Sequence, residues 1–212
     1  MRAMTADAAS VPIATRRPPA PVSRAPDLAD ALQQACRGQE AGFVTLYRDL
    51  QPRLVRYATV LVGRDDADDV TAEAWLQIAR ALPTFRGDLD GFRGWATIIV
   101  RNRAMDLLRA DTRHPTTPVG LHQLTEQPAA MDTATAALDS LSTNAAIRLI
   151  TRLPRAEAEA VMLRAVIGLD NAHTAAVLGR RSGAVRVAAH RGLKKLGQHL
   201  RYLPWERRWT VE

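Results

Sequence analysis

The 212-residue sequence has few cysteines, few aromatic residues and no long hydrophobic run. Its single cysteine, Cys36, excludes a disulfide framework or a cysteine-rich zinc site within one chain. No apolar run approaches the roughly 20 residues that span a bilayer, and the N-terminus lacks the apolar core of a signal peptide. We therefore expect a cytoplasmic protein without membrane insertion, and no motif predicts a metal or another cofactor.

Aromatic residues make up only 5% of the chain, whereas hydrophobic residues as a whole make up 47%. Much of the remainder is alanine and leucine, which favour helix over strand. Apolar residues recur at helical spacing over 43–61, 70–82 and 95–108, and Gly63 and Pro83 are expected to end the first two helices. No alternating strand pattern competes there, so the sequence predicts an all-α fold.

Charge is unevenly distributed along the chain. Residues 114–143 carry three acids and no Lys or Arg, whereas residues 144–212 carry 13 basic and five acidic side chains, net +8. A basic C-terminal third is typical of a nucleic-acid binder, although a solvated surface explains the charge alone equally well. Charge, proline content and periodicity together predict five segments: a disordered tail (1–26), a helical domain (27–113), an acidic flexible linker (114–143), a second helical domain (144–200) and a C-terminal tail (201–212).

The second helical domain contains the pattern of a helix-turn-helix. Asp170 can cap a short helix over 171–178, Gly179 can end it, and Ser182 can cap a long last helix. Projected at about 100° per residue, the last helix has a basic side and an apolar side that includes Leu193. We expect the turn and the basic side to contact DNA through Arg180, Arg181, Ser182, Arg186, Val187, His190, Arg191 and Lys194.

Within that set, the N-terminal half of the last helix lies where a recognition helix meets base edges in the major groove. Arg186 and Arg191 can pair bidentately with guanine, and Val187 can contact a thymine methyl group. Lys194 and the two arginines in the turn are expected to meet phosphates. The structural alternative is an ordinary helical hairpin with a solvated basic face.

Several segments resemble those of bacterial sigma factors of the sigma-70 family. Residues 66–75 (DADDVTAEAW) resemble the segment that binds core RNA polymerase, and residues 92–109 (FRGWATIIVRNRAMDLLR) resemble the segment that melts and recognises the minus-ten element. Residues 153–164 and 183–193 resemble the domain that binds the minus-thirty-five element. Two such domains without a third between them are similar to the extracytoplasmic-function (ECF) type, over roughly residues 40–200.

The resemblance implies a transcription initiation factor rather than an enzyme, with a sigma region 2 bundle over 27–113 and a region 4 helix-turn-helix over 144–200. It implies two partners, promoter DNA and core RNA polymerase, the latter through its β′ coiled coil and β flap. An anti-sigma factor is a further candidate partner.

An acidic helix start can dock on a basic partner helix, although capping explains one or two of its acids. The expected polymerase contacts are Asp66, Asp68, Asp69, Glu73 and Trp75.

For the minus-ten element, the resemblance implies that Asn102 and the loop at 85–90 capture an extruded base. An amide can donate to and accept from a base edge, which makes this chemistry reasonable. The structural alternative pairs Asp106 with Arg109 as an i,i+3 ion pair. The expected minus-ten contacts are Phe85, Arg86, Asp88, Arg93, Arg101, Asn102, Arg103, Asp106, Arg109 and Arg113.

Three other functions compete with this interpretation. Residues 65–69 match the DDxxD pattern of magnesium–diphosphate enzymes, but no second metal motif accompanies them. A conventional helix-turn-helix transcriptional regulator would carry an α/β or ligand-binding domain in front, where residues 27–113 predict only helices. A sigma-like decoy would bind polymerase without supporting transcription.

Overall fold

The computed structural model describes residues 27–113 and 143–202, and every regular element within them is helical. This confirms the predicted all-α fold over those residues. The N-terminal part contains α1 (Leu28–Cys36), α2 (Glu40–Val62), α3 (Ala67–Ala81), the 3-10 turn η1 (Leu82–Thr84) and α4 (Leu89–Arg113).

The C-terminal part begins with a helical segment over residues 143–150. It continues with α6 (Arg155–Val161), the π-helical η2 (Met162–Ile167), α7 (Asn171–Leu178) and α8 (Ser182–Tyr202). The predicted tail at 1–26 and almost all of the predicted linker and C-terminal tail lie outside the described residues. Within them, no helix is long and apolar enough to cross a membrane.

The helix ends follow the local signals in the sequence. Gly63 ends α2, and Gly179 ends α7 in the left-handed conformation with φ 62°, which costs glycine little because it has no Cβ atom. Asp170 caps α7, as predicted, and its Oδ1 accepts a hydrogen bond from the His173 backbone N–H at 2.7 Å. The cap predicted at Ser182 is off by one, because Ser182 is already the first residue of α8.

The Asp170 cap predicts an acid-dependent loss of stability. The hydrogen bond from the His173 backbone lowers the pKa of Asp170. A carboxylate with a lowered folded pKa stabilises the fold fully above its unfolded pKa of about 3.9, and the contribution is lost as pH falls through the folded value. Asp170→Asn keeps an oxygen acceptor at the cap but cannot titrate. Urea midpoints of the wild type should therefore fall more steeply than those of the variant between about pH 5 and pH 2; parallel curves would contradict this role.

The N-terminal helices form a bundle in which α2, α3 and α4 pack against one another around fully buried side chains such as Leu54, Ile78 and Val100. Helix α1 crosses α2 at Gly42, where a Cβ atom would lie 2.5 Å from the Ala31 carbonyl oxygen. The two helices therefore meet backbone to backbone, as only glycine permits at this distance.

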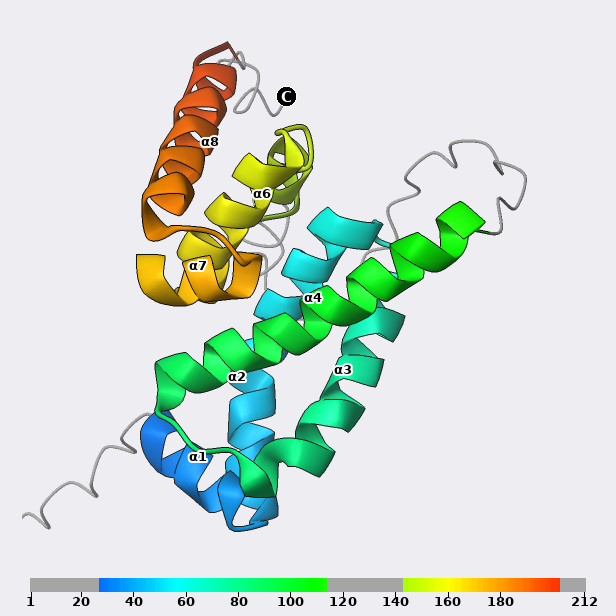
Figure 1. Ribbon diagram of the computed structural model, residues 1–212, viewed down its shortest axis with the longest axis vertical. Helices are drawn as coiled ribbons and strands as arrows, with labels where there is room; N and C mark the ends of the chain where they lie inside the picture. Colours follow the sequence, from blue (N-terminus) through cyan, green and yellow to red (C-terminus); the bar gives the residue numbers. More distant parts are fainter. Residues whose placement is uncertain (1–26, 114–142, 203–212) are drawn as a thin grey trace, which may run out of the picture.

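The two halves of the chain share one hydrophobic core. Helix α2 packs against η2 and α6, and α4 packs against α7, so the C-terminal helices sit on the N-terminal bundle. Figure 1 shows α6, α7 and α8 gathered at one end of the molecule and α1 at the other. The side chains that fill this contact from the C-terminal half are fully or almost fully buried: Met162, Leu163, Ile167 and Leu169.

Candidate nucleic-acid interface

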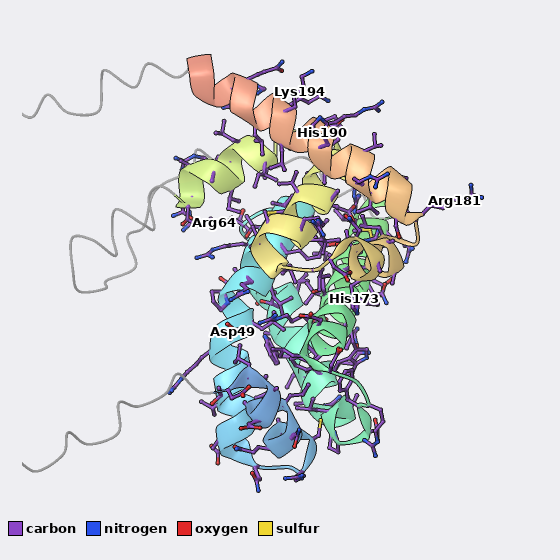
Figure 2. All side chains as sticks on the ribbon, turned by 90° about the vertical axis from the view of Figure 1, so that its left-hand side faces the viewer. Asp49, Arg64, His173, Arg181, His190 and Lys194 are labelled. Atoms are coloured by element: carbon purple, nitrogen blue, oxygen red, sulfur yellow. The ribbon has the colours of Figure 1, made fainter. Side chains whose placement is uncertain are left out.

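Helix α8 has one buried side and one exposed basic side. Val185 and Ala189 are buried on the side that faces α6 and α7. Figure 2 shows His190 and Lys194 spaced along α8, and Arg181 in the turn just before its start, at the outer end of the molecule. All eight residues predicted for the minus-thirty-five element are exposed: Arg180, Arg181, Ser182, Arg186, Val187, His190, Arg191 and Lys194.

A close contact with α6 fixes which side of α8 faces solvent. A Cβ atom at Gly192 would lie 2.7 Å from Cγ2 of Val161, so the two helices approach closely here. Lys195 Nζ adds an ion pair with the Glu157 carboxylate at 2.9 Å. The prediction that Leu193 packs on the preceding helices was wrong, because this narrow contact leaves it 54% exposed.

The loop before α4 is held by its own side chains. Phe85 packs against Phe92 and Trp95, with ring centroids 5.8 and 5.1 Å away. The Asp88 Oδ1 accepts a hydrogen bond from the Gly91 N–H at 2.8 Å and so caps α4. In this conformation, Phe85 is partly buried against α4, whereas Asp88 is exposed but already engaged as the cap of α4.

Arginines on α4 differ sharply in their availability. The side chain of Arg93 is 17% exposed and pairs with Asp90 at 3.2 Å and with Asp49 of α2 at 3.7 Å. Arg103 is more exposed and lies 3.2 Å from the Gln77 amide oxygen and 4.0 Å from the Glu73 carboxylate, both on α3. Arg93 therefore braces α4 against α2, whereas Arg103 remains accessible.

The exposed end of α4 holds the remaining minus-ten candidates. Asp106 and Arg109 form the i,i+3 ion pair considered as the structural alternative, with 2.9 Å between Oδ1 and Nη1. Asn102 is exposed one turn before Asp106. Arg86 lies in the loop and is also exposed, while the Arg113 side chain is outside the described part of the structure.

Arg101 is turned into the contact between the two halves of the chain. Its Nε donates to Glu159 Oε2 of α6 at 2.9 Å, and Arg155 Nε donates to the other oxygen, Oε1, at 3.0 Å. Arg155 also donates to Met105 Sδ of α4 at 2.8 Å. Burial lowers the pKa of Arg101, but the hydrogen bond and charge of Glu159 outweigh this and raise it overall. Burial, reinforced by Glu159, likewise raises the pKa of Tyr57, so this phenol stays neutral.

Helix α3 presents its acidic residues to solvent. Asp66 occupies the N-cap position, but its side chain makes no cap hydrogen bond, so capping does not account for these acids. A DDxxD enzyme requires its aspartates in an enclosed cavity, whereas the acids at the start of α3 are exposed. The exposed acids are Asp65, Asp66, Asp68, Asp69 and Glu73.

Trp75 does not lie on this acidic surface. It is 5% exposed, packs edge-on against Phe43 and at a tilt against Tyr47, and donates from Nε1 to the Gln51 side chain. It thus supports the surface from beneath. Sequence reasoning missed Leu76, which is 59% exposed one turn after Glu73. The sequence could have indicated Leu76, because it is an apolar residue that lies outside the apolar stripe of the helix over 70–82.

Family models match both halves of the chain. The model for sigma-70 region 2 matches residues 46–114, and the model for sigma-70, region 4 matches residues 143–196. A region 2 match in front of the helix-turn-helix contradicts the conventional regulator considered as the alternative.

Curated relatives extend the similarity over most of the chain. The ECF RNA polymerase sigma factor ShbA of Streptomyces griseus is 30% identical over 78% of this chain and 91% of its own length. SigD of Mycobacterium tuberculosis, another ECF RNA polymerase sigma factor, is 31% identical over 77% and 79%.

A solved structure of the sigma factor RpoE with the anti-sigma factor NepR, from Bartonella quintana, shares the fold. Its TM-score is 0.59 at 19% identity, over 76% of this chain and 97% of that one. The helices, the two family matches and the relatives agree, and the chain belongs to the ECF sigma factors of the sigma-70 family.

Proposed function

We propose that this chain recruits core RNA polymerase through α3 and directs it to promoters through α8 and α4, as a non-catalytic subunit working in the cytoplasm. The observation that carries the proposal is that all eight residues predicted for the minus-thirty-five element, on α8 and in the turn before it, are exposed, whereas the opposite side of α8 is buried. A helix with one anchored side and one basic side is the form that enters a major groove.

On the minus-thirty-five element, the start of α8 meets base edges and its later turns meet the backbone. Arg186 and Val187 lie one turn from the helix start, where recognition helices contact bases. Lys194 and the turn arginines Arg180 and Arg181 supply charge for phosphates. These phosphate contacts fix the register, while the base contacts select the sequence.

On the minus-ten element, α4 traps bases that have left the stack. Asn102 offers an amide to an extruded base, and the exposed Arg86, Arg103 and Arg109 supply charge for the backbone. Unstacking costs a few kcal/mol, and capture of the flipped base offsets part of that cost. Polymerase performs the phosphoryl chemistry.

Core polymerase binds at an exposed face of α3. We call this face the docking surface, and it consists of Asp66, Asp68, Asp69, Glu73 and Leu76. Four carboxylates beside one exposed leucine suit a basic helix with an apolar contact at its centre. The relative from Bartonella quintana was solved with an anti-sigma factor. We therefore include an anti-sigma factor among the proposed partners.

The proposal is tested by transcription from a library of supercoiled promoters, with purified bacterial core polymerase in the presence and absence of this chain. Transcripts that depend on the chain and share two upstream elements are expected. A chain that binds core polymerase but yields no transcripts would instead be a decoy. Duplex binding without core binding would overturn the sigma assignment of α3.

Arg186→Ala should reduce affinity for the selected promoter by about tenfold to a hundredfold while affecting random duplex much less, because a bidentate base contact discriminates by about 1–3 kcal/mol. Fluorescence anisotropy of the holoenzyme on both duplexes measures the two affinities. Lys194→Ala is the matched control and should weaken both equally, with a shallower salt dependence. Equal losses for Arg186→Ala on the two duplexes would remove its base-reading role.

A further inference from the structure

The contact between the two halves of the chain has a charged centre. Glu159 is only 4% exposed, although it carries a carboxylate. It is neutralised from both sides, by Arg101 of α4 and by Arg155 of its own helix. We name Arg101, Arg155 and Glu159 the interdomain ion cluster. A buried carboxylate needs such partners, because an unpaired charge is very costly away from water.

Arg101 is also one of the residues expected to contact the minus-ten DNA. A guanidinium that donates to a carboxylate cannot offer the same N–H groups to a phosphate oxygen. The Arg101 side chain is 26% exposed, compared with 43% for Arg103 and 66% for Arg109 on the same helix. Glu159 therefore engages the Nε–H of Arg101 and blocks the bidentate contact that this edge of the guanidinium would make with a phosphate.

The same contact brings the two DNA-binding elements too close together for one promoter. Helix α7 contacts both α4 and α8, so two helix-packing steps, or about 20 Å, separate α4 from α8. Elements near positions −10 and −35 lie about 85 Å apart on B-form DNA, at about 3.4 Å per base pair. Binding both elements at once therefore requires the contact to open, which frees Arg101.

On the basis of the proposed function, we propose that the free chain is closed, and that in the closed chain Glu159 pairs with Arg101 and withholds it from nucleic acid until polymerase or promoter DNA separates the two halves. The apolar side chains of η2 on α2 supply most of the attraction, since burial of apolar area stabilises a contact more than a partly exposed ion pair does. The interdomain ion cluster links closure to DNA binding, because it pairs Arg101, which is one of the arginines expected to contact the minus-ten DNA.

The test uses the full chain without polymerase and a short fluorescent single-stranded DNA of mixed sequence. Glu159→Gln preserves the side-chain shape but removes the charge that holds Arg101. One additional phosphate contact should steepen the slope of log affinity against log salt by about 0.7 and tighten binding about tenfold at low salt. Anisotropy titrations at several salt concentrations give both quantities.

Glu157→Gln is the matched control, because Glu157 lies on the same helix and pairs with Lys195 rather than with α4. It should leave the slope at the wild-type value. Adding Arg101→Ala to Glu159→Gln should abolish the gain in slope. Equal slopes for Glu159→Gln and Glu157→Gln would overturn the proposal, and so would a gain that survives Arg101→Ala.

A reversible lock tests the closure without changing Glu159. Gly94→Cys on α4 and His173→Cys on α7, in a chain with Cys36→Ser, place one thiol on each side of the contact, because a Cβ atom at Gly94 would lie 3.9 Å from the His173 Cβ. Both substitutions leave the interdomain ion cluster intact. A cleavable bismaleimide should abolish promoter-dependent transcription, and its cleavage should restore it. Undiminished transcription by the locked chain would overturn the proposal. If the chain were not a sigma factor at all, it would be inactive with core polymerase both before and after the cross-link is cleaved. That result is distinguishable from failure of the closure proposal.

Discussion

Asp69→Arg should weaken binding of the chain to core RNA polymerase by about a hundredfold or more, because disrupting a charge pair buried at an interface costs at least about 2–5 kcal/mol. Asp69 is exposed on α3, one turn before Glu73 and two turns before Leu76. Reversal of its charge would place a cation against the basic surface that the acids of α3 fit. Surface plasmon resonance with immobilised core polymerase measures the change.

The control for this experiment is Asp30→Arg, which reverses an equally exposed acid in the first turn of α1. It should leave core affinity within about twofold, because long-range surface charges are screened by salt. Each variant places a cation in the first turn of a helix, so both urea midpoints should fall by a similar small amount, on the order of 0.5–1 kcal/mol in unfolding free energy. Retained core affinity in Asp69→Arg would exclude the docking surface as the polymerase contact.

Gly42→Ala should lower the free energy of unfolding by about 3 kcal/mol, at the upper end of the cost of overpacking. The added methyl group would lie 2.5 Å from the Ala31 carbonyl oxygen and 2.7 Å from the Ala35 nitrogen. Both atoms belong to the backbone of α1, so no rotamer change relieves the clash. Helix α1 must move off α2, which exposes Leu32. Urea denaturation followed by far-UV circular dichroism measures the loss.

Gly197→Ala provides the matched control because it makes the same chemical change inside a helix. A Cβ atom at Gly197 meets no atom within 4 Å. The higher helix propensity of alanine should therefore stabilise α8 by up to about 1 kcal/mol. If Gly42→Ala were as stable as the wild type, α1 and α2 would not cross closely in solution.

Local patterns predicted the helices because helix formation is decided within a few turns of chain. The stripe over 43–61 lies within α2, and the Asp170 cap and the Gly179 terminator of α7 are both where the sequence indicated. Helix ends were less exact, as at Ser182, because the first and last turns of a helix depend on cap geometry rather than on periodicity. The sequence predicted a helical domain over 27–113 but did not resolve α1 as a separate helix, because nine residues are too few for a clear apolar stripe.

The availability of side chains at the site was harder to predict, because it depends on contacts between segments far apart in the chain. Periodicity places Arg101 on a helix, but only the packing of the C-terminal helices on the N-terminal bundle brings Glu159 to it across 58 positions. Trp75 has a similar limitation, since its burial depends on Phe43 and Tyr47 of α2. By contrast, the exposure of the residues predicted on α8 followed from the sequence, because one helix and its immediate neighbours determine which side faces solvent.

The shared core also has a consequence for the chain as it emerges from the ribosome. Helix α4, the last helix of the N-terminal bundle, is complete about 46 residues before Glu159 is made, an interval of roughly 2–9 s at about 5–20 residues per second. During that interval the bundle of α1 to α4 can fold, but Glu159 has not yet been synthesised. The nascent chain therefore passes through a stage in which the docking surface of α3 and Arg101 are both available. Polymerase present at that time would meet the chain before its first closure.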